Sequence, residues 1–142
     1  MTTAQSDTPA EPPSPDSGAA TSIFARAGGF DFFERLVEQF YVGVRADPVL
    51  FALYPQPDDL ASAKRHLTLF LAQYWGGPTT YDDERGHPRL RMRHAGFPID
   101  DAMRDRWMTH MSNALAACAV PTDLATEMRE YFGRAADHLR NV

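Results

Sequence analysis

Histidine offers this sequence its widest choice of chemistry, and it occurs five times, at positions 66, 87, 94, 110 and 138. Most single histidines in proteins are ordinary surface or core residues. A structural zinc site needs four Cys or His ligands in close pairs, whereas this chain has one cysteine, Cys118, and no tightly spaced histidine pair. The sequence also lacks a Gly-x-Ser-x-Gly turn for a nucleophilic serine and a glycine-rich phosphate loop. The remaining familiar use of a lone histidine in a helical protein is as an axial ligand of haem iron.

Composition limits the partners of the chain. Its 142 residues are 44% hydrophobic and 23% charged, which suits one globular domain. A net charge of −5 provides no broad basic face for nucleic acid or an anionic membrane. The single cysteine excludes an internal disulfide and fits a reducing compartment, so we expect a cytoplasmic protein. The longest stretch free of charge and strong polarity, residues 114–120, is far shorter than the roughly 20 residues that cross a bilayer.

The chain divides at residue 22. Residues 1–22 are rich in proline and small polar residues, have no large apolar side chain after Met1, and show no signal-peptide pattern. We predict a disordered tail there and a folded domain over residues 23–142.

Within the domain, apolar residues recur at helical spacing and no alternating strand pattern occurs. Four substantial helices are expected, over 30–46, 60–74, 101–117 (capped by Asp100) and from about 124 to 139. Short segments lie at 48–54 and 88–95, and residues 79–87 show the character of an extended surface loop. The prediction is an all-α fold with four substantial helices and two short ones.

One stretch of the sequence is distinctive. Tyr74-Trp75-Gly76-Gly77-Pro78 is followed by Tyr81 and by the run Arg-Gly-His-Pro-Arg-Leu-Arg-Met-Arg-His at 85–94. Together with Phe40-Tyr41, the corner Leu53-Tyr54-Pro55 and Trp107, this pattern resembles the group II truncated haemoglobins of bacteria, from about Phe24 to Leu139. The resemblance implies a truncated globin fold, in which two antiparallel helix pairs sandwich a haem b.

The resemblance makes His94 the proximal iron ligand. A neutral imidazole binds the metal through one nitrogen, and an acceptor holds the other N–H. Met92 competes for this role, but two residues away on the same turn it would point elsewhere. Arg91 and Arg93 flank the ligand, either as a solvated basic edge or as partners of the haem carboxylates, and Arg93 is the better candidate.

Other contacts to the haem also follow from the resemblance. Tyr81 matches a position that reaches a haem propionate. His66 departs from relatives that carry an arginine on the distal helix, so that contact could fall to His66 or to Lys64, and both stay unassigned. Leu67 and Phe70 would be apolar walls that exclude water.

The distal face needs a hydrogen-bond donor. Ala63 occupies the place where other globins have a distal histidine, so the donor must come from another element. By resemblance, Tyr41, Tyr54 and Trp107 converge on the bound ligand; each could equally be core, yet a buried O–H or N–H needs an acceptor.

The expected function is binding of dioxygen, nitric oxide, carbon monoxide or peroxide at the haem, with slow release. Oxidation of nitric oxide or turnover of peroxide is a possible role by resemblance, so whether the protein is an enzyme stays open. A redox cycle would need a separate reductase, since no flavin or nicotinamide motif is present. A homo-oligomer is possible. The alternative is a haem-free helical interaction module, in which the aromatic residues only fill the core.

Overall fold

The computed structural model describes residues 22–54 and 60–142, apart from the side chain of Arg91, and all regular structure in this part is helical. The long helices are α2 (Phe30–Arg45), α4 (Leu60–Tyr74), α7 (Asp101–Ala117) and α8 (Thr122–Leu139). The short helices are α1 (Ile23–Ala27), α3 (Pro48–Phe51), α5 (Thr80–Arg85) and α6 (Leu90–His94). The all-α class and the four long helices are confirmed, whereas the described residues form four short helices instead of the two expected.

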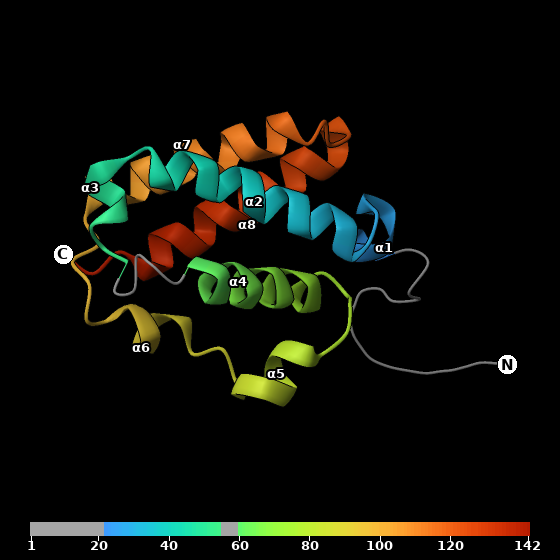
Figure 1. Ribbon diagram of the computed structural model, residues 1–142, viewed down its shortest axis with the longest axis horizontal. Helices are drawn as coiled ribbons and strands as arrows, with labels where there is room; N and C mark the ends of the chain where they lie inside the picture. Colours follow the sequence, from blue (N-terminus) through green and yellow to red (C-terminus); the bar gives the residue numbers. More distant parts are fainter. Residues whose placement is uncertain (1–21, 55–59) are drawn as a thin grey trace, which may run out of the picture.

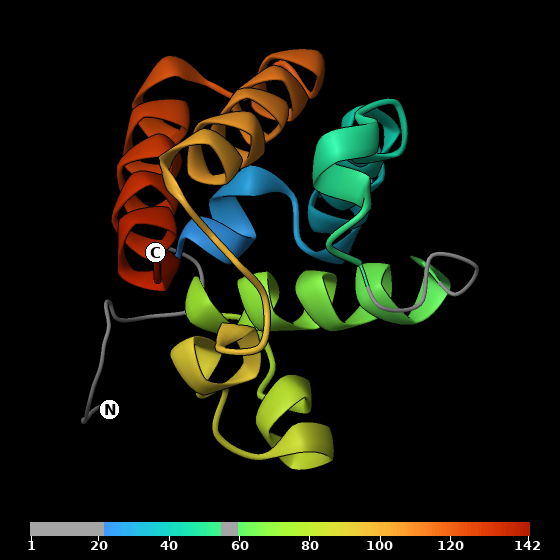
Figure 2. The ribbon, with the colours of Figure 1, turned by 90° about the vertical axis from the view of Figure 1, so that its left-hand side faces the viewer.

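The long helices are arranged around α2. Helix α2 packs against both α4 and α7, and α7 packs against α8. Figure 1 shows α5 and α6 on the side of α4 that faces away from α2, and Figure 2 shows α7 and α8 side by side above α4. Helix α6 also reaches α8. None of the helices in the two described stretches is long and apolar enough to span a membrane.

The core is built from the apolar stripe of α2. The residues of this stripe are all buried: Phe33, Leu36, Val37, Phe40, Tyr41 and Val44. The largest side chains, Phe33 and Phe40, have no exposed surface. Opposite them lie Met111 of α7 and Met128 and Phe132 of α8. Burial of each large apolar side chain contributes about 1.5–3 kcal/mol, so this stripe is the main stabilising feature of the fold.

The apolar side of helix α4 is buried along most of its length but not at its C-terminal end. Leu60 and Leu71 are buried, but Tyr74 is 48% exposed. Its ring stacks on Tyr131 of α8 at a centroid distance of 4.0 Å. Tyr74 continues the helical spacing of apolar residues past the edge of the core, where stacking on a neighbouring ring replaces burial.

The N-termini of several helices follow local rules. Asp100 caps α7, as expected, by accepting a hydrogen bond from the backbone N–H of Met103 at 2.9 Å. Ser22, which the sequence placed in the tail, caps α1 through its hydroxyl. Residues 1–21, the remainder of the expected tail, lie outside the described residues.

The prediction of an extended loop at 79–87 was wrong, because Thr80–Arg85 forms α5. A six-residue helix is too short to display an apolar period, and its stability comes from contacts with α4. The side chain of Gln73 accepts a hydrogen bond from the backbone N–H of Asp82 at 3.0 Å, and Arg65 of α4 pairs with Glu84. Tyr81 lies on this helix and is 4% exposed.

Candidate functional site

His94 is the last residue of α6, and its orientation is fixed by its own helix. Its Nδ1 lies 2.6 Å from the carbonyl oxygen of Leu90. A carbonyl can only accept, so Nδ1 carries the hydrogen and the lone pair of Nε2 is left to bind a metal. The half-buried side chain therefore has the tautomer and the fixed ring that an axial ligand requires.

The surroundings of His94 fit an iron that brings most of its own ligands. Among the described residues, no three His, Cys, Asp or Glu side chains cluster closely enough to hold a metal ion. Haem iron already has four porphyrin nitrogens and needs only an axial protein ligand. The competing ligand Met92 is 61% exposed, so its side chain does not face the core.

Tyr41 and Tyr54 form a hydrogen-bonded pair. Tyr41 is 4% exposed on α2, and the ring of Tyr54, just after α3, lies 5.7 Å from it in an edge-to-face arrangement. Burial raises the pKa of Tyr41 to about 12, although the hydrogen bond to Tyr54 partly opposes this shift. The pKa of Tyr54 is raised well above 10, first by burial and then by Tyr41. Both phenols therefore keep their protons at neutral pH, and because the bond between them uses one O–H, the pair retains a second O–H for a ligand.

Trp107 reaches this pair through Phe40. Its ring lies 5.2 Å from that of Phe40, which in turn lies 5.1 Å from the ring of Tyr41. Trp107 is half-buried and packs against the core, and its indole N–H can only donate. Of the three expected distal donors, the structure brings Tyr41 and Tyr54 into direct contact. The ring of Phe40 lies between Tyr41 and the third donor, Trp107.

One side of α4 supplies apolar surface. Ala63, Leu67 and Phe70 are half-buried and pack against the core. Phe70 also contacts Tyr81 of α5, with ring centroids 5.6 Å apart. The spacing of three and four residues places these side chains along one face of the helix, as a wall that could exclude water.

Arg93 holds the approach to α6. Its Nε donates to the carbonyl oxygen of Pro88 at 2.7 Å, and Nη2 donates to that of Arg85 at 3.3 Å. These bonds fix the connection between α5 and α6 and leave other N–H groups of the guanidinium for an anion. The contact from Arg93 to a haem carboxylate stays a prediction, as does that from Tyr81.

Arg85 was missed by the sequence analysis as a site residue. Its Nη1 donates to Nε2 of His66 at 3.1 Å, and its guanidinium lies over the ring of Tyr81, 5.9 Å from the centroid. Its Nε is buried and has no hydrogen-bond partner among the described residues. Burial, followed by the charge of Arg85, lowers the pKa of His66, which keeps that imidazole neutral and able to accept. A half-buried cation whose described contacts include no carboxylate is a good place for an anionic group.

Lys64, the alternative to His66, is already engaged. Its Nζ lies 3.0 Å from a carboxylate oxygen of Glu38 on α2. Between the two unassigned candidates, the structure therefore connects His66, and not Lys64, with the cationic group of Arg85.

A buried carboxylate links the junction of α2 and α3 to α7. Asp47, 8% exposed at the junction of α2 and α3, accepts hydrogen bonds from the Leu50 backbone at 3.2 Å and from Arg106 at 2.9 Å. Its other oxygen lies 2.8 Å from Nε2 of His110. The hydrogen bond from His110 is the largest of the effects that lower the pKa of Asp47 to about 2. Arg106 and His110 lie on either side of Trp107 in α7. Their bonds to Asp47, which we call the Asp47 brace, hold this part of α7 close to the end of α2.

Comparisons with known proteins agree with this geometry. The family model of bacterial-like globins matches residues 22–141. The chain belongs to the bacterial-like globin family. The group 2 truncated hemoglobin YjbI of Bacillus subtilis is 38% identical to this globin over 117 residues, which are 80% of this chain and 84% of the relative.

Similarity to solved structures shows which kind of globin this chain resembles. A thermostable hemoglobin from the actinobacterium Thermobifida fusca superposes with a TM-score of 0.83 at 48% identity, covering 86% of this chain and 98% of that one. The group II truncated hemoglobin of Bacillus anthracis gives a TM-score of 0.82 at 34% identity, with coverage of 86% and 98%. These likenesses confirm the truncated globin fold and the group II resemblance. They also support a haem cofactor and the binding of small diatomic ligands by this globin.

Proposed function

We propose that this globin holds a haem b with His94 as its axial ligand and binds oxygen with slow release. The observation that carries the proposal is the bond from Nδ1 of His94 to the Leu90 carbonyl, because it leaves Nε2 unprotonated on a fixed ring. A haem bound here would supply the iron that takes up the diatomic ligand. The protein supplies the orientation of the ligand and its hydrogen bonds.

Slow release follows from the number of donors on the distal side. The Tyr41–Tyr54 pair has one O–H beyond the bond that joins it, and Trp107 adds an indole N–H. With haem in place, these donors would stabilise a ligand that gains negative charge on binding, as dioxygen would, and would have less effect on carbon monoxide. Because both tyrosines have pKa values far above neutrality, the donors are present throughout the physiological pH range.

The haem carboxylates would meet the cationic side of the site. Arg85, with its buried and unpaired Nε, is the first partner, and neutral His66 holds its guanidinium in place. Arg93 and Tyr81 remain the partners proposed from sequence, with Arg93 contributing whichever N–H groups its two backbone bonds leave. Charge-assisted bonds of this kind are stronger than neutral ones.

A role in oxidation of nitric oxide or in peroxide turnover would suit a globin that releases oxygen slowly. Either reaction consumes reducing equivalents, so a separate reductase would complete the cycle. The haem-free alternative gives no reason for the fixed ring of His94 or for the buried Nε of Arg85, which has no partner among the described residues.

The test is the visible spectrum of the protein purified with haem. We expect a strong haem absorption from the wild type and its loss in His94→Ala, while His138→Ala, an exposed control on α8, retains it. A colourless wild type would favour the haem-free module. Equal haem content and an unchanged ferrous spectrum in His94→Ala would refute the assignment of the ligand.

A further inference from the structure

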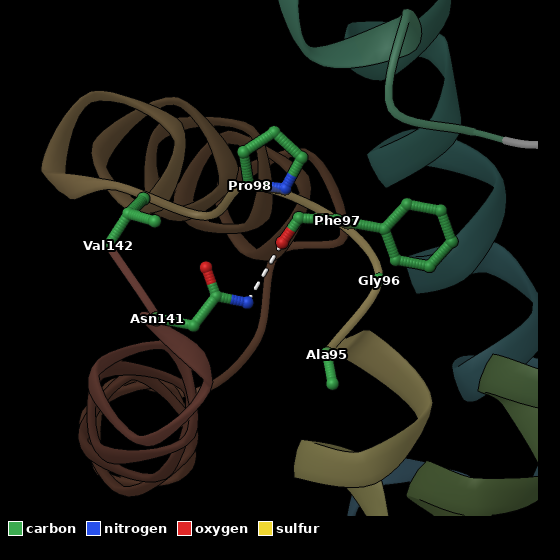
Figure 3. Close-up of a pocket in the computed structure, with 6 residues that line it drawn as sticks. All are labelled: Ala95, Gly96, Phe97, Pro98, Asn141 and Val142. Carbon is green, nitrogen blue, oxygen red and sulfur yellow. Dashed lines mark hydrogen bonds between the residues drawn. The ribbon is translucent and has the colours of Figure 1, made fainter.

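Asn141 lies beyond the end of α8, next to the segment that follows the proximal histidine. Its side-chain Nδ2 donates to the carbonyl oxygen of Phe97 at 2.8 Å and, more weakly, to that of His94 at 3.3 Å. Its Oδ1 accepts a hydrogen bond from the backbone N–H of Ile99 at 2.9 Å. Figure 3 shows the side chain turned toward this segment and bonded to Phe97. One amide thus uses both of its polar atoms on the backbone of residues 94–99.

The main chain of the same residue strengthens this connection. The N–H of Asn141 donates to the carbonyl oxygen of Ile99 at 2.8 Å, and the N–H of Val142 lies 3.3 Å from the same oxygen. Asn141 and Ile99 therefore exchange bonds in both directions. We call the bonds of Asn141 to residues 94–99 the Asn141 clamp.

Helix α6 needs such a clamp. It has five residues, and a helix of this length is unstable without tertiary contacts. Its N-terminal side is held by Arg93, whose guanidinium bonds to the backbone of Pro88 and Arg85. On its C-terminal side, Ala95 and Gly96 are exposed, and the local backbone bond from Phe97 N–H to the His94 carbonyl spans only one turn. The Asn141 clamp connects this weakly packed side to α8, which belongs to the core.

We propose that Asn141 is a positioning residue for the proximal ligand, holding the backbone of His94 and thereby the ring that binds the haem iron. The inference rests on the proposed function, since it concerns His94 as that ligand. Asn141 does not touch the metal. Its effect reaches the imidazole through the carbonyl of His94 and through the turn at Phe97.

The variant Asn141→Leu tests the clamp, because leucine has a similar volume and no polar atoms. A cavity of about 430 Å³, lined by Ala95, Gly96, Phe97, Pro98, Asn141 and Val142, gives the new side chain room. Asn113→Leu, on the exposed side of α7, is the matched control. Four properties of the haem-loaded proteins are measured: loss of haem to an excess of an acceptor apoglobin, the iron–histidine vibration of the ferrous form, hydrogen exchange at the Ile99 amide, and the rate of oxygen release.

A net hydrogen bond changes an equilibrium by about 2- to 13-fold, so removal of the clamp should accelerate haem loss by about 2- to 13-fold. The iron–histidine band should shift or broaden and Ile99 should exchange faster, whereas oxygen release should change less than about twofold because the distal donors are untouched. The control should match the wild type in all of these. Asn141→Asp, which keeps an acceptor for Ile99 and loses the donor, covers the case in which the leucine variant fails to fold; it should also lose haem faster.

Faster exchange at Ile99 with unchanged haem loss and an unchanged vibration would overturn the proposal, because the clamp would then not reach His94. Unchanged exchange at Ile99 would overturn it too, by showing that the clamp does not form in solution. These results are distinct from failure of the proposed function, which is read from the wild type and from His94→Ala.

Discussion

Replacement of Trp107 by phenylalanine should accelerate the release of oxygen by about 10- to 100-fold. The indole of half-buried Trp107 can only donate, so its N–H would be a fixed donor to the bound ligand. A hydrogen bond to a charged or partly charged group contributes about 1.5–3 kcal/mol, and each 1.4 kcal/mol corresponds to about a tenfold change. Phenylalanine retains an aromatic ring to pack against Phe40 and Phe132, which lie 5.2 and 5.7 Å from the indole ring. The loss should therefore come from the donor and not from the core.

Stopped-flow measurement of oxygen release is the assay, with release of carbon monoxide as the internal control. Carbon monoxide is a weaker acceptor when bound, so its release should change much less. Parallel acceleration of both gases would mean that the shape of the pocket has changed. Unchanged oxygen release in Trp107→Phe would refute the reasoning and leave the tyrosine pair as the source of slow release.

Three further substitutions probe the rest of the site. Tyr41→Phe should accelerate oxygen release less than Trp107→Phe does, and the double variant should fall short of the product of the single effects, because the donors share one ligand; additive stopped-flow rates would contradict this. Arg85→Leu should accelerate haem loss about tenfold, measured by transfer to an apoglobin, with exposed Arg45→Leu as the control. Asp47→Asn should lower the melting temperature at neutral pH. Because the pKa of Asp47 is lowered to about 2, its stabilising effect is present above a pH of about 4 and is lost as the pH falls through about 2. The melting temperatures of the wild type and of Asp47→Asn should therefore converge in acid. A constant difference between them down to a pH of about 2 would exclude the carboxylate as the cause.

The long helices could be predicted because their apolar positions recur over 15 or more residues and give a period that the core enforces. Helices α1 and α5 were missed because five or six residues cannot display such a period. The stability of α5 comes from side chains of the preceding helix α4, such as Gln73 and Arg65, and not from its own residues. Short helices of this kind are decided by tertiary contacts that no local pattern records.

The site divides in the same way. His94 and the aromatic donors could be proposed from sequence because they belong to a recognisable pattern of residue types, and their roles stay predictions. Arg85, Asp47 and Asn141 were missed because their partners are 19, 63 and 44 residues away. Arginine, aspartate and asparagine are common on surfaces, so their residue type alone carries no signal. An orphaned Nε or a doubly engaged amide becomes visible only when the helices are in place.

The close approach of α7 to α2 depends on Gly43. A Cβ built at this position would come within 2.5 Å of Nδ1 of His110, the residue that bonds to Asp47. A larger side chain at this position would push α7 away from α2. The distance between His110 and Asp47 would increase, and so would the distance between Trp107 and the tyrosine pair.

The proximal side has the opposite character. Between Pro78 and Asp100, Tyr81 is the one described side chain that is buried, so α5 and α6 contribute little apolar burial of their own. Free energies of local opening scale with such burial, and this segment should open far more readily than the four long helices before haem is present. Insertion of the cofactor and closure of the segment then become one event. We therefore expect uptake and loss of haem to depend on local opening of this segment and not on unfolding of the four long helices.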